Sequence, residues 1–176
     1  RSASVHVADR DGHTPLMYAA LFDRPAAIGV LHEAGARLDD LNVRGQSALY
    51  ITMIRRHTAS AKILLHRGAR LADKNTSAND MLALAIRAGD VSLTDTIIRR
   101  GGNVRELERQ KGISLVWLTP PTVNVELLRL LVRHGMDVNH RASDGRTPLM
   151  YAAQARRSDI VRLMLELKAD PNQRDR

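Results

Sequence analysis

The sequence predicts an all-α fold, organised as a solenoid of stacked helix-turn-helix units. Two observations carry this prediction. The ten residues that start at Asp11 return almost unchanged at Asp144, and this offset of 133 residues (144 minus 11) is four periods of about 33. Apolar residues make up 44% of the chain but aromatic residues only 3%, so the core must consist mainly of side chains that helices tolerate well.

A second marker keeps the same period. An apolar run ends at Gly35, Gly68, Gly101 and Gly135, and Lys168 stands at the fifth place. Because the two markers stay in phase, we expect a single domain over 1–176. Its five repeats are predicted at approximately 9–41, 42–74, 75–107, 108–141 and 142–174, with 1–8 as the remnant of a preceding loop or an N-terminal extension.

The first helix of each repeat should begin at a residue that can cap it. A side-chain oxygen can accept a hydrogen bond from the free N–H groups of a first helical turn. The expected caps are Thr14, Ser47, Asp80, Ser114 and Thr147.

Two further features support these helix starts and predict the helix ends. Proline follows the cap in the first and last repeats, at Pro15 and Pro148, where a missing N–H costs nothing. The second helix carries a larger apolar stripe, as in 127–131, and ends before a glycine that can adopt positive φ.

These motifs resemble the ankyrin repeat, a β-turn followed by two helices with the signature Thr-Pro-Leu-His-x-Ala. Residues 14–16 and 147–149 match the signature, the middle repeats match more loosely, and the resemblance covers nearly the whole chain. The signature histidine is absent from every repeat. The resemblance implies an ankyrin-repeat solenoid with finger loops, and a non-enzymatic protein-protein interaction through the concave face formed by the fingers and first helices.

The family's partner-binding positions can be mapped onto this chain. They fall on Arg10, His13, Phe22, Arg44, Gln46, Ile54, Arg55, Asn79, Arg87, Lys111 and Arg146. The cations would form a basic track, with Phe22 and Ile54 as an apolar anchor. Because the planar guanidinium of Arg pairs well with carboxylates, we expect a protein partner with an acidic surface.

The net charge of +8 leaves other interpretations open. It could serve nucleic-acid or other polyanion binding, although aromatic residues for base stacking are nearly absent. It could equally be a solvated basic surface, and the repeats could be a structural or regulatory segment of a larger protein. Only four of the 27 basic residues are Lys and there is no Cys, which favours a bacterial source and a regulator, inhibitor or protective partner.

No motif of catalysis, cofactor binding or metal binding is present. The seven histidines lack metal-ligand spacing, and the chain has no phosphate-binding glycine loop, no nucleophile elbow and no Cys. No apolar run approaches the ~18 residues of a membrane span. We therefore expect a soluble binding protein of the bacterial cytoplasm, or of the periplasm or exterior if a leader has been removed.

The fourth repeat departs most from the pattern. Pro120 and Pro121 should end its first helix early. The single tryptophan, Trp117, precedes them and has two interpretations. It could anchor a partner, as Trp often does at interfaces, or it could fill the space that the shortened helix leaves. We favour the second interpretation.

Overall fold

The computed structural model describes residues 4–73, 75–120 and 125–174. These residues form helices and loops without a strand, which confirms the predicted all-α fold. The chain divides into two compact units, Arg1–Ser77 and Ala78–Arg176. That the repeats form one domain stays a prediction.

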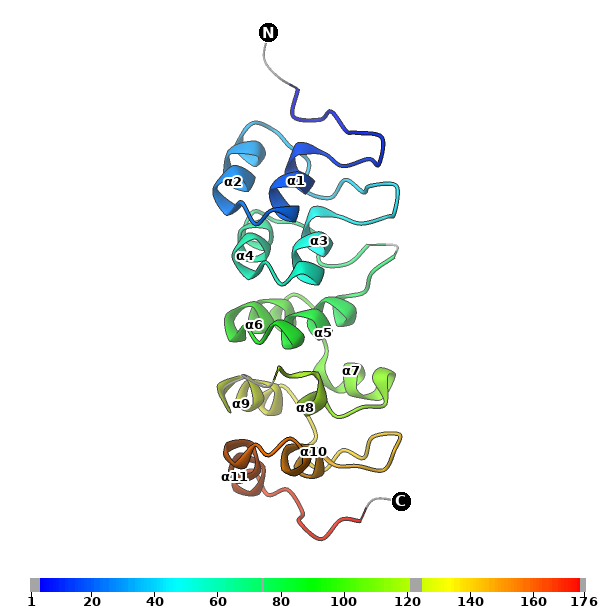
Figure 1. Ribbon diagram of the computed structural model, residues 1–176, viewed down its shortest axis with the longest axis vertical. Helices are drawn as coiled ribbons and strands as arrows, with labels where there is room; N and C mark the ends of the chain where they lie inside the picture. Colours follow the sequence, from blue (N-terminus) through cyan, green and yellow to red (C-terminus); the bar gives the residue numbers. More distant parts are fainter. Residues whose placement is uncertain (1–3, 74, 121–124, 175–176) are drawn as a thin grey trace. The chain divides into compact units, whose positions relative to one another are not determined.

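Unit 1 contains two helical hairpins. The first consists of α1 (Pro15–Leu21) and α2 (Pro25–Glu33), and the second of α3 (Ala48–Arg55) and α4 (Thr58–His66). The hairpins stack in register, since α1 packs on α3 and α2 packs on α4. The first helices α1 and α3 lie beside the finger loops, whereas α2 and α4 lie on the far side (Figure 1).

Capping and burial follow the sequence prediction in unit 1. The hydroxyl of Thr14 accepts a hydrogen bond from the Met17 amide at 3.3 Å, and that of Ser47 accepts one from Tyr50 at 3.1 Å. Each cap satisfies one free amide of a first turn. The largest fully buried side chains between the helices of this unit are Leu16, Met17, Ile28, Leu49, Leu64 and Leu65.

The finger loops of unit 1 are joined by a backbone hydrogen bond. The amide of Val43 donates to the carbonyl of Asp11 at 3.0 Å. This close approach requires Gly12, because a Cβ there would lie 3.0 Å from the Val43 nitrogen, and its φ is +77°. The second finger continues the chain of contacts, since the side-chain amide of Asn75 donates to the carbonyl of Gly45 at 3.2 Å.

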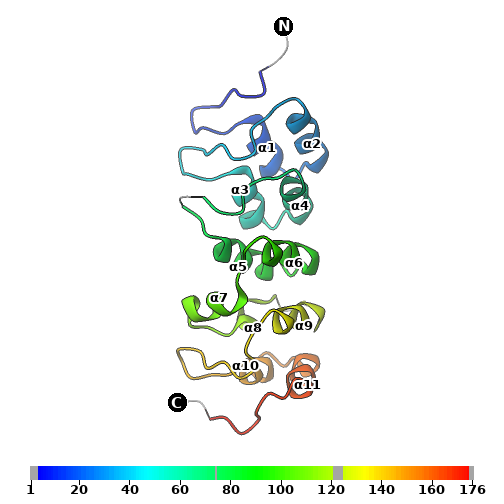
Figure 2. The same ribbon diagram turned by 180° about the vertical axis from the view of Figure 1, so that it is seen from behind.

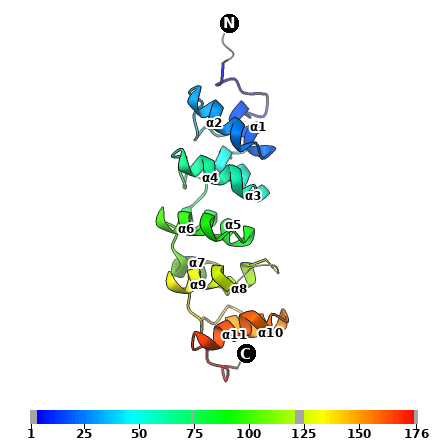
Figure 3. The same ribbon diagram turned by 90° about the vertical axis from the view of Figure 1, so that its left-hand side faces the viewer.

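Unit 2 contains the remaining helices of the described residues. They are α5 (Ala78–Ala88), α6 (Val91–Arg99), α7 (Val104–Lys111), α8 (Leu115–Leu118), α9 (Val125–Arg133), α10 (Pro148–Gln154) and α11 (Ser158–Glu166). Within this unit α5 pairs with α6, α10 pairs with α11, and α8 packs on α10 (Figure 3). Helix α7 lies on the same side as the loop that precedes α10 (Figure 2).

One of the five predicted caps is wrong. Ser114 and Thr147 cap α8 and α10, but α5 begins at Ala78, so Asp80 lies inside its first turn. An acidic residue is favourable there because the N-terminus of a helix carries a partial positive charge. The Asp80 carboxylate also accepts a hydrogen bond from Lys111 at 3.2 Å.

Helix α7 was not predicted. The sequence indicated a finger turn in this part of the fourth repeat, and the structure has two turns of helix instead. Asn103 caps α7 by accepting from the Glu106 amide at 3.0 Å, and Glu106 pairs with Arg109 one turn later at 2.6 Å. Val104 and Leu107 are buried against the rest of unit 2. Lys111 therefore lies at the end of a helix and not on a finger tip.

The early end of the first helix in repeat four is confirmed. Helix α8 has four residues and ends at Leu118, before Thr119 and Pro120. Pro121 lies outside the described residues. The interpretation of Trp117 as a filler of the vacated space is wrong, because its side chain is 61% exposed.

The helix-ending positions give a stability prediction. Gly35 and Lys168 occupy equivalent places after α2 and α11, with φ of +93° and +67°. A residue with a Cβ is disfavoured in this left-handed conformation by about 1 kcal/mol. We expect Lys168→Gly to raise the free energy of unfolding by about 1 kcal/mol in urea titrations.

The reverse change is the matched control. No heavy atom lies within 4 Å of a Cβ placed at Gly35, so Gly35→Lys introduces backbone strain without a clash. It should lower the free energy of unfolding by a similar amount. Equal stability of both variants and the parent chain would contradict this account of the helix ends.

Candidate functional site

An exposed apolar patch lies on the finger and first-helix face of unit 1. Phe22, at the end of α1, is 59% exposed, and Ile54, near the end of α3, is 42% exposed. Tyr18 stands one turn before Phe22, and the two rings stack with centroids 6.4 Å apart and planes 8° apart. Sequence analysis missed Tyr18, although its spacing of four residues from Phe22 places both on one helix face.

Tyr18 is held in place by the first finger. Its hydroxyl donates a hydrogen bond to Asp9 at 2.6 Å. This bond lowers the pKa of the Asp9 carboxyl and raises the pKa of the Tyr18 hydroxyl, because it favours the carboxylate and opposes ionisation of the phenol. The patch formed by Tyr18, Phe22 and Ile54 is therefore partly ordered before any partner arrives.

Three predicted basic residues belong to the same fingers and first helices as this patch. The side chains of Arg10, Arg44 and Arg55 are exposed and have no hydrogen-bond or ion-pair partner among the described residues. By contrast, Arg67 and Arg70, which follow α4, pair with Glu33 and Asp39 at 2.8 and 2.9 Å. The three free guanidiniums are thus available to an external carboxylate.

Two other predicted residues of unit 1 mainly hold the fingers together. His13 lies 3.2 Å from the side-chain nitrogen of Asn42, and the same nitrogen donates to Gln46 at 3.1 Å. The Asn42 oxygen accepts from the amides of Arg44 and Gln46 at 3.0 and 2.9 Å. His13 and Gln46 are partly buried in this network and support the tip that carries Arg44.

Most of the predicted binding residues of unit 2 have side chains that are engaged in contacts within the protein, unlike Arg10, Arg44 and Arg55. Asn79 accepts from the amide of Asn103 at 2.9 Å and donates to Gln110 at 3.3 Å, so it fastens α7 to α5. Arg146 donates to Gln154 at 3.0 Å and lies 6.0 Å from the ring of Tyr151.

The other two predicted binding residues of unit 2, Lys111 and Arg87, differ in whether their charge is paired. Lys111 forms an ion pair with Asp80, as described above. Arg87, in the last turn of α5, is exposed and has no side-chain partner in the described ranges. Of the four predicted residues in this unit, Arg87 is therefore the one whose charge is fully available.

Helix α7 also buries a carboxyl group. Glu108 is 3% exposed, and one of its oxygens accepts from the amide of Asp137 at 3.0 Å. Its other oxygen has no protein partner, and neither has Nε2 of His140, which lines the same cavity of about 670 Å³. Burial raises the pKa of Glu108 to about 7, because the charged form loses its hydration.

One cluster has the atom types of a metal site. Oxygen and nitrogen atoms of Asp9, Asp11 and His13 lie within 4.8 Å of one another. However, one oxygen of Asp9 accepts from the amides of Asp11 and His13, and the other accepts from Tyr18. The finger turn itself accounts for this arrangement.

Comparison with known proteins decides the family. The family model described as ankyrin repeats (3 copies) matches residues 1–78 and 82–175. The chain belongs to the ankyrin-repeat family. Ankyrin repeats are protein-interaction modules, and the family is generally non-enzymatic.

Curated relatives share the repeats across longer proteins. The chain is 26% identical to an L-asparaginase of Dirofilaria immitis, covering 89% of this chain and 26% of that protein. It is 29% identical to a putative ankyrin repeat-containing protein of Treponema pallidum, covering 65% and 38%. Mouse rabankyrin-5 is 25% identical over 93% of this chain and 14% of its own length. The chain thus spans less than two fifths of each of these relatives.

A solved structure has the same ankyrin fold. It is the complex of a predatory endopeptidase from Bdellovibrio bacteriovorus with an immunity protein. The matched chain aligns with a TM-score of 0.68 and 19% identity, over 94% of this chain and 86% of that chain. In the described part of this ankyrin chain, no helix has the length and apolar character needed to cross a bilayer.

Glu108 predicts a pH dependence of stability. Its folded-state pKa of about 7 exceeds the ordinary value of 4.5, so the folded state holds a proton that the unfolded state releases. Protonation of Glu108 therefore contributes fully to the free energy of unfolding below about pH 4.5. This contribution is lost as the pH rises to about 7. The loss should be on the order of 1–3 kcal/mol.

Glu108→Gln tests this prediction, because the amide keeps the acceptor for Asp137 and cannot ionise. The free energy of unfolding should be similar in the two proteins near pH 4 and higher in the variant near pH 8, by urea titration at each pH. Other titrating groups are common to both proteins and cancel in the difference. A difference that stays constant from pH 4 to pH 8 would show that Glu108 does not carry this effect.

Proposed function

We propose that this ankyrin chain is a non-enzymatic module that binds a protein partner with an acidic surface. The binding face is the finger and first-helix face of unit 1. The observation that carries the proposal is that the fingers and first helices of unit 1 present three unpaired guanidiniums, those of Arg10, Arg44 and Arg55, together with the exposed apolar side chains of Tyr18, Phe22 and Ile54.

The two kinds of side chain have different roles in the proposed interface. Covering the apolar patch supplies affinity, at roughly 25 cal/mol for each Å² removed from water. The exposed guanidiniums of the same unit accelerate encounter with an acidic surface and orient the partner, because exposed charges at an interface act mainly on the association rate. In unit 2, Arg87 extends the set of free cations.

A role as a bacterial regulator, inhibitor or protective partner is part of the proposal. Its support is the repeat relative in Treponema pallidum and the similar fold in a Bdellovibrio complex that contains an immunity protein. The compartment stays open between the bacterial cytoplasm and, after removal of a leader, the periplasm or exterior. The chain matches only 26% of the L-asparaginase and 14% of rabankyrin-5, which is compatible with a role as a binding segment of a longer protein.

Charge reversal on the binding face tests the proposal. Arg44→Glu with Arg55→Glu lowers the net charge from +8 to +4, since each change removes two units. Bait protein is used to capture partners from a lysate of the source organism at low salt, followed by mass spectrometry. The double variant should retain about tenfold less of the partner that the parent chain captures, and added salt should reduce the difference.

A matched control reverses two charges elsewhere. Arg133 on α9 and Arg162 on α11 are exposed on second helices, and neither side chain has a partner within the described residues. Arg133→Glu with Arg162→Glu makes the same change in net charge and should leave capture nearly unchanged. Equal losses in both double variants would indicate a general effect of charge, and capture of nucleic acid in place of protein would overturn the proposal.

A further inference from the structure

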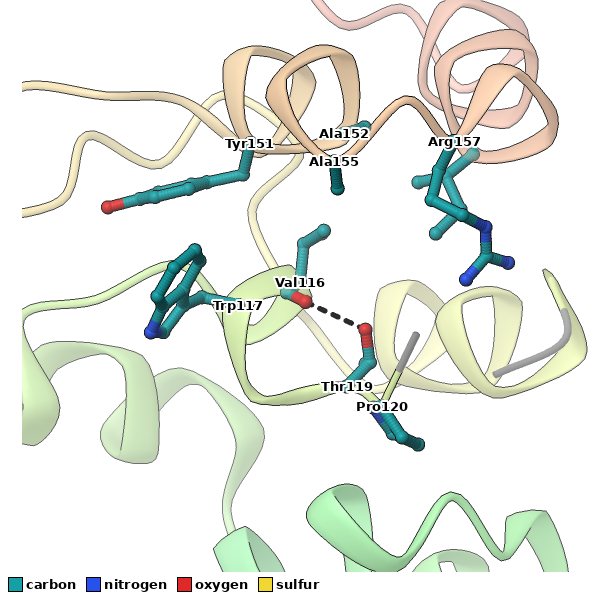
Figure 4. A pocket seen from close by; sticks show the side chains of 9 residues that line it. Val116, Trp117, Thr119, Pro120, Tyr151, Ala152, Ala155 and Arg157 are labelled. Carbon is teal, nitrogen blue, oxygen red and sulfur yellow. Dashed lines mark hydrogen bonds between the residues drawn. The ribbon is translucent and has the colours of Figure 1, made fainter. Parts of the chain in front are cut away.

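Unit 2 contains an apolar pocket that the binding face described above does not include. It lies between α8 on one side and α10 and the start of α11 on the other, and its volume is about 420 Å³. Figure 4 shows Trp117 and Tyr151 facing each other at one end of the pocket, with Arg157 at the other end. The Trp117 and Tyr151 rings are 5.4 Å apart and tilted by 44°.

The pocket results from the short helix of repeat four. Helices α1 and α10 have seven residues each, and α5 has eleven, whereas α8 has four and turns away at Thr119 and Pro120. Among the described residues, no further turn of α8 covers the α10 surface around Ala155. Ala155 is exposed although it lines the pocket.

The position that Trp117 occupies is exposed in repeat four and not in the other four repeats. Its equivalent in repeat one is Met17, which is 1% exposed, and in repeat three it is Ala83, which is 9% exposed. At Trp117 the exposed fraction is 61%. A large aromatic side chain beside an open apolar pocket is a typical centre of binding energy at protein interfaces.

The interior of the pocket favours an apolar occupant. The hydroxyl of Thr119 donates to the carbonyl of Val116 at 2.7 Å, and the Tyr151 hydroxyl donates to Asp144 at 2.8 Å. In the described chain, the buried polar atoms that lack a partner belong to other regions. Away from the Trp117 indole and the Arg157 guanidinium, an incoming polar group would thus lose its hydration without gaining a hydrogen bond.

The surroundings of the pocket are basic. Arg157 lines it, Arg146 lies over the ring of Tyr151, and Arg156 is exposed between α10 and α11. Two carboxylates lie near these cations, Asp144 beside Arg146 and Asp159 beside Arg157. Cations outnumber carboxylates here by three to two, which favours an approaching negative charge.

We propose that this pocket, the Trp117 pocket, receives an apolar side chain from an acidic segment of the protein partner, with leucine as the model anchor. The proposal rests on the proposed function in that it assumes a protein partner, but it concerns different residues. It names the partner's recognition element: one branched apolar side chain flanked by carboxylates.

Charge argues for a partner of this kind and against a second copy of the chain. Two copies would each carry +8, and association through a basic rim would bring like charges together. An acidic segment meets no such repulsion. The pocket volume of about 420 Å³ lies within the ~300–1,000 Å³ of typical ligand sites, so a leucine side chain fits inside the pocket without filling it.

The only tryptophan of the chain provides the measurement. Three acetylated, amidated pentapeptides are titrated into the intact protein: Asp-Glu-Leu-Asp-Glu, the same peptide with Ala in place of Leu, and Lys-Lys-Leu-Lys-Lys. The leucine peptide with acidic flanks should shift the Trp117 emission to shorter wavelength in a saturable manner. The alanine and lysine peptides should bind about tenfold more weakly or not at all.

Two matched variants localise the effect. Ala155 lines the pocket, whereas Ala153 is also exposed near the end of α10 but does not line it. Ala155→Glu should weaken binding of the acidic leucine peptide about tenfold, because the new side chain enters the pocket and repels carboxylates. Ala153→Glu should leave the binding curve nearly unchanged, and both variants keep Trp117 as the reporter.

The outcomes separate the alternatives. Absence of saturable binding by the parent chain, equal binding of the leucine and alanine peptides, or equal loss in both variants would overturn the proposal. Light scattering that shows a dimer of the parent chain and a monomer of Ala155→Glu would assign the pocket to a second copy and would also overturn it. None of these results bears on Arg44 and Arg55, so the proposed function is tested separately by partner capture.

Discussion

A single hairpin of two short helices cannot bury its own apolar face, and the rest of the structure follows from this constraint. In unit 1 the second hairpin covers the first, so Ile28 and Leu64 are fully buried. Stacking also brings the second finger close enough for Val43 to bond Asp11 of the first. In unit 2 it brings the loop before α10 close enough for Ser143 to bond Gly112, at the end of α7, at 2.8 Å. The face that carries the candidate binding residues is a consequence of this pairing.

Local chemistry explains which parts of the fold could be predicted from sequence. A cap, an N1 proline and a terminal glycine act within one turn, and Thr14, Pro15 and Gly35 have the predicted roles. Repeat position predicted a cap at Asp80 and a finger turn in place of α7, and both predictions are wrong because local helix propensity outweighs repeat position there. The segment capped by Asn103 continues as a helix, and its buried Leu107 stabilises that helix.

In the candidate site, too, some features follow from local sequence and others depend on distant residues. Exposure at Phe22, Ile54 and Arg55 agrees with repeat position alone, since the end of a first helix faces outward. Contacts between fingers depend on the identity of neighbours 29 or more residues away, as for His13 and Asn42. The exposure of Trp117 depends on a helix that ends after four residues, and no local pattern around the tryptophan encodes that length.

Amide hydrogen exchange tests most directly whether stacking pairs the fingers. Val43 is 70% exposed and Ser143 is also exposed, yet the Val43 amide donates to the preceding finger and the Ser143 amide donates to Gly112 at the end of α7. We expect these two amides to exchange much more slowly than the unprotected rate, and the amide of Arg10 to exchange freely, when read residue by residue by NMR. Free exchange at Val43 and Ser143 while helix amides stay protected would contradict the account.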